Sequence, residues 1–221
     1  MKIVIVGPGA MGCLFAAFLS KSDEEIILLD KNKERAGLIQ EQGILVEGVS
    51  GSWHSQVKTS SQPADLTPAD LVIICVKSYD TKEAIEFAKP LIGENTYVLT
   101  LQNGLGNIEI ISEIIGDDNV IGGVTNQGAT LLAPGKIRHA GIGEIVIGKS
   151  DGKIPVQLKE IRELFNKVGL QTRISRDIKG LIWSKLIINV GINALTAITR
   201  LNNGRLVEFE GTRRILRTAV T

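Results

Sequence analysis

The sequence predicts an α/β protein, and three observations support this prediction. Apolar strand-like runs alternate with helical patterns in the N-terminal half, which is typical of a parallel sheet. Glycine is frequent, with 24 residues, whereas aromatic residues make up only 4% of the chain, as expected for aliphatic strands and helices joined by tight turns. The 43% hydrophobic and 22% charged residues are the composition of an ordinary globular protein.

Hydrophobic periodicity assigns the elements of the N-terminal half. Strands are expected at residues 2–6, 25–29, 44–47, 57–59, 71–76 and 97–100, and helices at residues 10–20, 33–42 and 81–91. Residues 120–148 differ, because short β-prone runs are separated by Ala133-Pro134-Gly135 and by Gly141 and Gly143. This segment predicts antiparallel hairpins that extend the edge of the sheet.

The C-terminal part of the chain has a helical pattern. A helix at residues 156–168 and a strand at residues 170–174 close a first domain, which we assign to residues 1–176. Asp177 is a predicted helix cap, and helices are expected at residues 178–199 and 204–220, which belong to a second unit of residues 177–221. An apolar helix such as Leu181–Ile198 needs partners on several sides. We therefore expect a truncated helical domain or cover from another subunit, and a homodimer is the hypothesis that this apolar surface suggests.

Composition excludes several classes of partner. The chain has 25 basic and 24 acidic residues, so the basic surface that nucleic-acid binding needs is not expected. Cys13 and Cys75 lie in apolar segments without a CxxC pattern, and His54 and His139 lack metal-ligand spacing, so neither a disulfide framework nor a metal site is predicted. Glycines interrupt the apolar N-terminal segment, which argues against a signal peptide or a membrane span. We expect a soluble, cytoplasmic protein.

A glycine-rich loop lies between the first predicted strand and the first predicted helix. Its sequence, Gly7-Pro8-Gly9-Ala10-Met11-Gly12, matches the GxGxxG pattern of dinucleotide-binding proteins. In that pattern the first glycine permits a tight turn, the second lets the backbone approach a pyrophosphate, and the third allows the helix to pack closely on the strand. The loop therefore predicts an NAD or NADP site.

The residues after the second strand leave the choice of cofactor open. Asp30 stands at the end of that strand, where an acidic residue can bind the ribose 2′-hydroxyl of NAD. Lys31 and Lys33 follow at once, and either could neutralise the 2′-phosphate of NADP. Both cofactors remain candidates.

Polar side chains share one face of the predicted helix at residues 178–199. At about 100° per residue, Lys185, Asn189, Asn193 and Thr196 fall on the same side, while the rest of the helix is apolar. This stripe either faces solvent or lines a cleft that holds a polar ligand, because burying these groups without partners is costly. A partly desolvated lysine has a lowered pKa and can donate a proton near neutral pH.

Two further candidates follow predicted strands. Lys77 comes after the strand at residues 71–76, and Asn103 comes after the strand at residues 97–100. Ligands of open α/β sheets bind outside the carboxyl ends of the strands. We expect both side chains to point toward the reactive end of the cofactor.

These motifs together resemble those of the ketopantoate reductases. The resemblance covers the whole chain and is carried by these segments: Gly7–Gly12, Val76-Lys77, Gln102-Asn103-Gly104, Lys185…Asn189…Asn193 with Leu195-Thr196-Ala197, and Asn203-Gly204. It implies a Rossmann domain followed by an all-helical domain, with a 2-keto acid in the cleft between them. It also implies reduction of ketopantoate to pantoate, usually with NADPH, on the route to pantothenate and coenzyme A.

The resemblance also implies roles for individual residues. Lys185 is similar to the general acid that protonates the ketone oxygen, and Asn103 is similar to the residue that holds the nicotinamide end of the cofactor. Asn189 and Asn193 look like amides that position the substrate, and Lys77 is similar to a lysine near the cofactor.

The chain departs from the family pattern in two places. Family members usually have a basic residue where this chain has Asp30, and their longer helical domain carries a substrate-binding serine and glutamate that find no counterpart here. Two alternatives follow: a cofactor-binding remnant with little catalysis, and a related hydroxyacid or glycerol-phosphate dehydrogenase.

Overall fold

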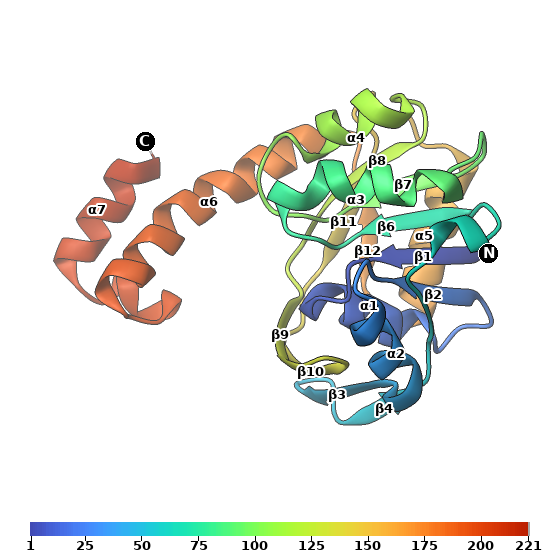
Figure 1. Cartoon of the computed structure of the whole chain (residues 1–221). Helices are drawn as coiled ribbons and strands as arrows, with labels where there is room; N and C mark the ends of the chain where they lie inside the picture. The colour runs from blue at the N-terminus through green and yellow to red at the C-terminus, as the bar shows by residue number, and fades with distance from the viewer. Residues whose placement is uncertain (221) are drawn as a thin grey trace.

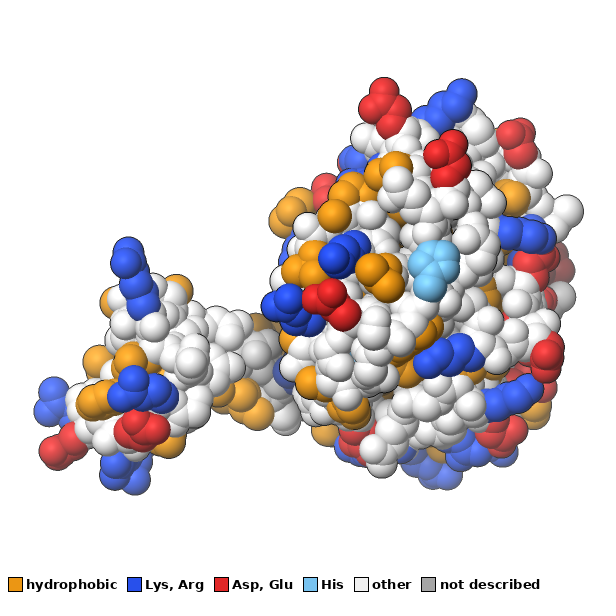
Figure 2. Space-filling model, turned by 90° about the horizontal axis from the view of Figure 1, so that it is seen from below, with side chains coloured by type: hydrophobic (Ala, Val, Ile, Leu, Met, Phe, Trp, Pro, Cys, Tyr) orange, Lys and Arg blue, Asp and Glu red, His pale blue; other side chains and the backbone are white. Residues whose placement is uncertain are grey.

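The computed structural model describes residues 1–220. An eight-stranded sheet with helices on both faces forms the body of the molecule, and the last two helices form an arm that projects from it (Figure 1, Figure 2). In spatial order the sheet contains β12 (Thr172–Ile174), β11 (Ile145–Gly148), β8 (Val120–Thr125), β7 (Tyr97–Thr100), β6 (Leu71–Ile74), β1 (Lys2–Val6), β2 (Glu25–Leu29) and β5 (Lys58–Ser60).

Six of these strands form a parallel array with the topology of a dinucleotide-binding domain. All neighbours from β5 to β8 are parallel. Numbered along the chain, these six strands have the order 3-2-1-4-5-6, so the order reverses between β1 and β6. The predicted α/β class is therefore confirmed, and the reversal is the place where such sheets bind ligands.

Seven α-helices and four short 3₁₀ helices complete the described chain. The α-helices are α1 (Ala10–Leu19), α2 (Lys33–Gln42), α3 (Thr81–Ala88), α4 (Asn107–Ile115), α5 (Val156–Lys167), α6 (Ile178–Thr199) and α7 (Glu210–Val220). The 3₁₀ helices are η1 (Pro63–Asp65), η2 (Ser78–Asp80), η3 (Lys89–Leu91) and η4 (Asn203–Val207).

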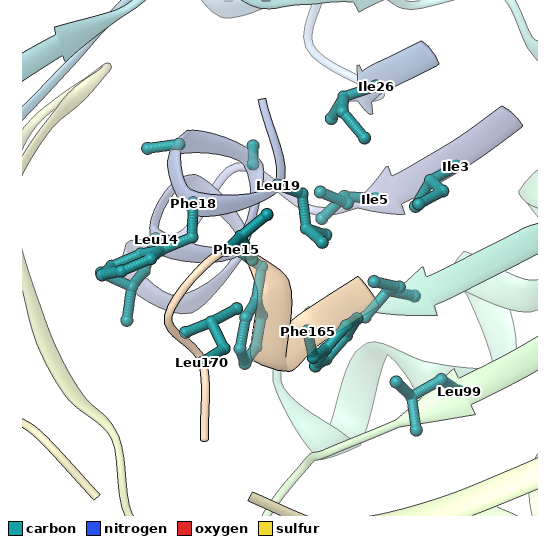
Figure 3. Close-up of a cluster of buried hydrophobic side chains, with 14 of the residues drawn as sticks. Ile3, Ile5, Leu14, Phe15, Phe18, Leu19, Ile26, Leu99, Phe165 and Leu170 are labelled. Carbon is teal, nitrogen blue, oxygen red and sulfur yellow. The ribbon is translucent and has the colours of Figure 1, made fainter. Parts of the chain in front are cut away.

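The core lies on both faces of the sheet, which explains why β1 is apolar throughout. Ile3 and Ile5 of β1 face α1 and α5, where the rings of Phe15 and Phe165 stack with centroids 6.2 Å apart (Figure 3). The alternate side chains of β1 belong to a second cluster with α3 and α4. A central strand buried on both faces needs a continuous apolar sequence rather than an alternating one.

A second, four-stranded sheet covers the outer side of α1. Its strands lie in the order β4 (Trp53–Ser55), β3 (Ile44–Gly48), β10 (Lys136–Gly141) and β9 (Gly128–Ala133). Phe18 of α1 makes edge-to-face contacts with Trp53 and with His139 of this sheet. The small sheet thereby holds α1 from behind and fixes the glycine loop that precedes it.

The expected antiparallel hairpins are present but arranged differently. β8 is parallel to β7 and belongs to the central array, whereas β11 is antiparallel to β8 and extends the sheet as expected. The β9–β10 hairpin leaves this sheet, because β10 pairs with β3 instead. Two elements, α4 and β4, were not predicted, and the helix expected at residues 204–220 is divided into η4 and α7.

The C-terminal arm begins at the predicted cap. The Asp177 carboxylate accepts a hydrogen bond from the Gly180 N–H, 2.9 Å long, at the start of α6. Of the 22 residues of α6, only Ile178, Gly191 and Leu195 are buried. Among the described helices, α6 alone is long and apolar enough to cross a membrane, a criterion that a core helix of a soluble protein also meets. The division at residues 176 and 177 and the homodimer stay predictions.

Candidate active site

A large cleft lies across the carboxyl ends of β1, β6 and β7. Its volume is about 930 Å³, and its walls also include the end of β2, the segment after β8 and one side chain of α6. Ten of the predicted site residues line it: Gly7, Pro8, Gly9, Ala10, Met11, Asp30, Lys31, Lys77, Asn103 and Lys185. Segments far apart in the sequence thus meet at the reversal of strand order, as the strand-end argument predicts.

The glycine loop has the geometry that its sequence predicts. Gly7 has a φ of +98°, and a Cβ on Gly12 would lie 2.0 Å from the carbonyl oxygen of Gly7. Only glycine fits at these two positions. Gly9 is different, because a Cβ there would meet no protein atom within 4 Å and would instead occupy space over the loop.

This loop fits a dinucleotide pyrophosphate. Gly9 caps α1 without a side-chain hydrogen bond, so the first N–H groups of the helix have no intrahelical partner. The open space over Gly9, the free N–H groups and the positive end of the helix dipole together form an anion site. A nicotinamide dinucleotide would bind its pyrophosphate to this loop.

The part of the cleft at the end of β2 holds an ion pair that the sequence did not predict. Asp30 is only 3% exposed and receives two hydrogen bonds from Arg35, of 2.5 Å from Nε and 2.7 Å from Nη2. The Asn32 N–H also donates to this carboxylate, at 3.0 Å. Arg35 and Lys31 both line the cleft. Lys31 pairs with Glu83, with 2.9 Å between its Nζ and the carboxylate. Arg35 was missed because Lys31 and Lys33 lie nearer to Asp30 in the sequence.

Lys185 is the one residue of α6 that lines the cleft. Its ammonium group donates a hydrogen bond to the backbone carbonyl of Thr125, at the end of β8. Burial lowers the pKa of Lys185 from its usual value, since removing water disfavours the charged form. The ammonium group of Lys185 is thus partly removed from water inside the cleft.

The other members of the polar stripe do not line the cleft. Asn189 is half-buried and Asn193 is exposed, and neither belongs to the walls of the cleft. The reason is the direction of α6, whose C-terminal part runs away from the body (Figure 1).

Sequence reasoning also missed Gln127. This side chain is buried and lines the cleft near Lys185. Its Oε1 lies 2.8 Å from Nε2 of His139, and Nδ1 of His139 lies 2.7 Å from the Ser50 hydroxyl. Burial lowers the pKa of His139. Through its hydrogen bond, His139 holds the Gln127 side chain in the wall of the cleft. No sequence motif indicated this pairing.

Comparison with known proteins identifies the family. A family model described as ketopantoate reductase PanE/ApbA matches residues 3–152. The chain belongs to the ketopantoate reductase family. The model of the C-terminal part of this family matches residues 177–221.

Ketopantoate reductases are also among the similar proteins and solved structures. The 2-dehydropantoate 2-reductase of Halobacterium salinarum is 36% identical, over 100% of this chain and 73% of that protein. The crystal structure of the enzyme from Geobacter metallireducens aligns with a TM-score of 0.91 and 30% identity, over 98% of this chain and 72% of that one.

A second kind of enzyme is similar in structure. D-mandelate dehydrogenase in complex with NADH and anilino(oxo)acetate aligns with a TM-score of 0.90 and 26% identity, over 98% of this chain. The resemblance of the chain to ketopantoate reductases is thus confirmed, as is its Rossmann-type fold.

Proposed function

We propose that this chain binds a nicotinamide dinucleotide in the cleft and reduces the keto group of ketopantoate to the hydroxyl of pantoate. One observation carries the proposal: a half-buried lysine with a lowered pKa enters the same cleft as the glycine loop. The named relatives support this substrate. The corresponding role is in pantothenate and coenzyme A synthesis, in the cytoplasm.

Lys185 is the general acid in this proposal. The bound cofactor supplies a hydride to the carbonyl carbon, so negative charge develops on the substrate oxygen. The Lys185 ammonium donates a proton to that oxygen, and its lowered pKa makes it a stronger acid. The Thr125 carbonyl accepts one of its three hydrogens and leaves the other two for the substrate.

The remaining predicted residues bind and orient. Asn103 and Lys77 hold the nicotinamide end of the cofactor, because their loops border the cleft at β7 and β6. Asn189 and Asn193 position the substrate from the face of α6 that carries Lys185. Because these two amides lie outside the cleft, their role requires α6 to move toward the body.

NADPH is the proposed cofactor. Both carboxylate oxygens of Asp30 are already bonded to Arg35, and Oδ1 also accepts from the Asn32 N–H, so Asp30 has little acceptor capacity left for a ribose hydroxyl. The Arg35 side chain is 40% exposed, and both Arg35 and Lys31 line the cleft. A guanidinium at this place matches the charge and the hydrogen-bond geometry of a 2′-phosphate.

A second candidate function is reduction of another 2-keto acid. The similarity to D-mandelate dehydrogenase supports a bulkier substrate and NADH. A competition assay between ketopantoate and an aryl 2-keto acid separates the two functions. A cofactor-binding remnant is the third candidate, and in that case Lys185→Ala changes nothing measurable.

Absorbance at the nicotinamide band tests the proposal. The purified chain is mixed with ketopantoate and either NADPH or NADH, and the same assay is run with Lys185→Ala. Oxidation of the cofactor that is lost in the variant supports the reductase. Cofactor binding without oxidation in the unmodified chain contradicts it and favours the remnant.

A further inference from the structure

Three buried polar side chains and the half-buried Gln102, which lines the cleft, connect two loops that carry predicted cofactor contacts. One loop follows β6 and carries Lys77, and the other follows β7 and carries Asn103. The four side chains, which we call the loop network, are Thr81, Thr100, Gln102 and Asn107. We propose that the loop network is a positioning device that sets the cofactor contacts of Lys77 and Asn103, and this inference rests on the proposed function.

Gln102 joins the two loops directly. Its Nε2 donates to the Val76 carbonyl and to the Thr81 hydroxyl, both at 2.9 Å. Its Oε1 accepts from the Thr100 hydroxyl at 2.8 Å. These partners fix the orientation of the amide, because the reversed amide would place an oxygen against the Val76 carbonyl.

Thr81 and Asn107 extend the network to both cofactor-facing residues. The single hydrogen of the Thr81 hydroxyl has two acceptors within reach, the Ser78 carbonyl at 2.8 Å and Oδ1 of Asn107 at 3.0 Å. Nδ2 of Asn107 donates to the Asn103 carbonyl at 3.3 Å. The backbone carbonyls on either side of Lys77, and that of Asn103 itself, are therefore held by side chains of one network.

Three of the four side chains of the network are buried, and this strengthens its hold on the loops. Thr81 is 0% exposed and Asn107 is 4% exposed. Hydrogen bonds are stronger in such surroundings, and a group that loses its partner there is costly. The network therefore favours one arrangement of the two loops over others.

Two glycines of the Asn103 loop have a left-handed backbone and open space beside them. Gly104 and Gly106 have φ values of +92° and +86°, and a Cβ on either would meet no atom within 4 Å. The side chain of Thr81 does not line the cleft, so an effect of Thr81 on ligand binding has to pass through the loops.

Substitution of Thr81 by valine tests the inference. Thr81→Val keeps the shape of the side chain but removes the hydroxyl that joins Gln102, Ser78 and Asn107. We expect the Kd for NADPH, measured by its fluorescence, to rise about 10-fold, because small misplacements of binding groups have large effects. Thr81→Ser restores the hydroxyl and the affinity. Asn107→Leu removes the hydrogen bond to the Asn103 carbonyl, so we expect it to raise the Kd as well. It replaces Thr81→Val as the test variant if Thr81→Val does not fold.

Thr96→Val is the matched control. Thr96 is 2% exposed, and its hydroxyl donates to the Ala69 carbonyl and accepts from the Gly93 N–H at 2.9 Å, before the start of β7 and away from the cleft. We expect it to lower the melting temperature as Thr81→Val does, without a change in Kd. Equal losses of stability with an unchanged Kd in both variants would overturn the inference.

A double-mutant cycle tests the route through Asn103. If the network acts by placing Asn103, Thr81→Val has little further effect on the Kd in an Asn103→Ala background, whereas additive effects contradict this route. Both tests measure cofactor binding, so they remain decisive even if the chain reduces no keto acid. Failure of the proposed reductase and failure of this inference are therefore distinguishable.

Discussion

At the scale of single residues, two charged side chains of the cleft are removed from water, one partly and one almost completely. Lys185 is half-buried against the Thr125 carbonyl, and the Asp30 carboxylate is buried against Arg35. The first has a lowered pKa and is suited to donate a proton. The second is bonded to a guanidinium that also faces the cleft.

The pH dependence of the reaction follows from the Lys185 pKa. In the proposed reaction, reduction needs the ammonium form of Lys185, so kcat/KM is expected to fall as the pH rises through a pKa below the usual value of 10.5. Oxidation of the alcohol needs the neutral amine and rises through the same pKa. Lys185→Ala is expected to lose about 100-fold or more in kcat. A pH profile of the reduction that is flat from neutral pH to pH 10.5 contradicts the assignment.

Cofactor preference is expected to depend on Arg35. Arg35→Met removes the proposed 2′-phosphate contact, which at about 1.5–3 kcal/mol for a charged hydrogen bond corresponds to a rise of about 10- to 100-fold in the Kd for NADPH. It also leaves Asp30 unpaired, so Arg35→Met combined with Asp30→Asn is the control for lost stability. Titration of both nicotinamide cofactors measures the preference. An unchanged ratio of the two Kd values counts against this role.

At the scale of elements, the glycine loop was predictable because its geometry depends on neighbouring residues. A strand, a tight turn and a helix follow each other directly, so the pattern from Gly7 to Gly12 contains the whole motif. Gln127 and the loop network were not predictable in this way. Their partners come from distant segments, as for Thr81 with Asn107, and only the sheet topology brings them together.

The pairing of β8 and the presence of α4 could not be predicted from the sequence for the same reason. β8 has two glycines in a short apolar run, which is also typical of an edge hairpin. Its pairing with β7 depends on α4, a helix between them that was not predicted. The apolar side chains of α4, Ile108 and Ile111, pack on the sheet next to α3, and this tertiary contact supports a helix of only 9 residues.

Two substitutions in the glycine loop separate packing from cofactor binding. Gly9→Ala meets no protein atom, so we expect an unchanged melting temperature and a Kd for NADPH raised about 10-fold or more, since the methyl group occupies the pyrophosphate space. Gly12→Ala forces a Cβ against the Gly7 carbonyl and is expected to lose about 1–3 kcal/mol of stability. Thermal unfolding and fluorescence titration measure both effects. Tight NADPH binding by Gly9→Ala would falsify the assignment of this loop.

At the scale of the whole molecule, the body and the arm differ in how they are stabilised. The two buried clusters of the body include side chains from both faces of the sheet. In the arm, large apolar side chains of α6 are about half exposed, among them Trp183 (55%), Ile187 (46%) and Val190 (53%). We therefore expect faster amide hydrogen exchange at residues 180–199 than in β1 and β6. Equal protection would show that the arm is covered in solution.

The separation of roles between body and arm leads to a prediction for a shortened chain. Residues 1–176 contain the glycine loop, the ion pair of Asp30 and Arg35, and nearly all of both buried clusters. We expect this chain to fold and to bind NADPH with a Kd close to that of the full chain, because Lys185 is the one contribution of α6 to the cleft. It is expected to reduce no keto acid, since the proton donor is absent.

The full chain with Lys185→Ala is the matched control for this experiment. It keeps the arm and lacks the same ammonium group, so the two proteins are expected to agree in cofactor affinity and in lost turnover. If the shortened chain instead unfolds while the control remains folded, the division at residues 176 and 177 is wrong. Ile178, which is 1% exposed in the body, would then have to count as part of its core, and α6 would stabilise the fold as well as carry the proton donor.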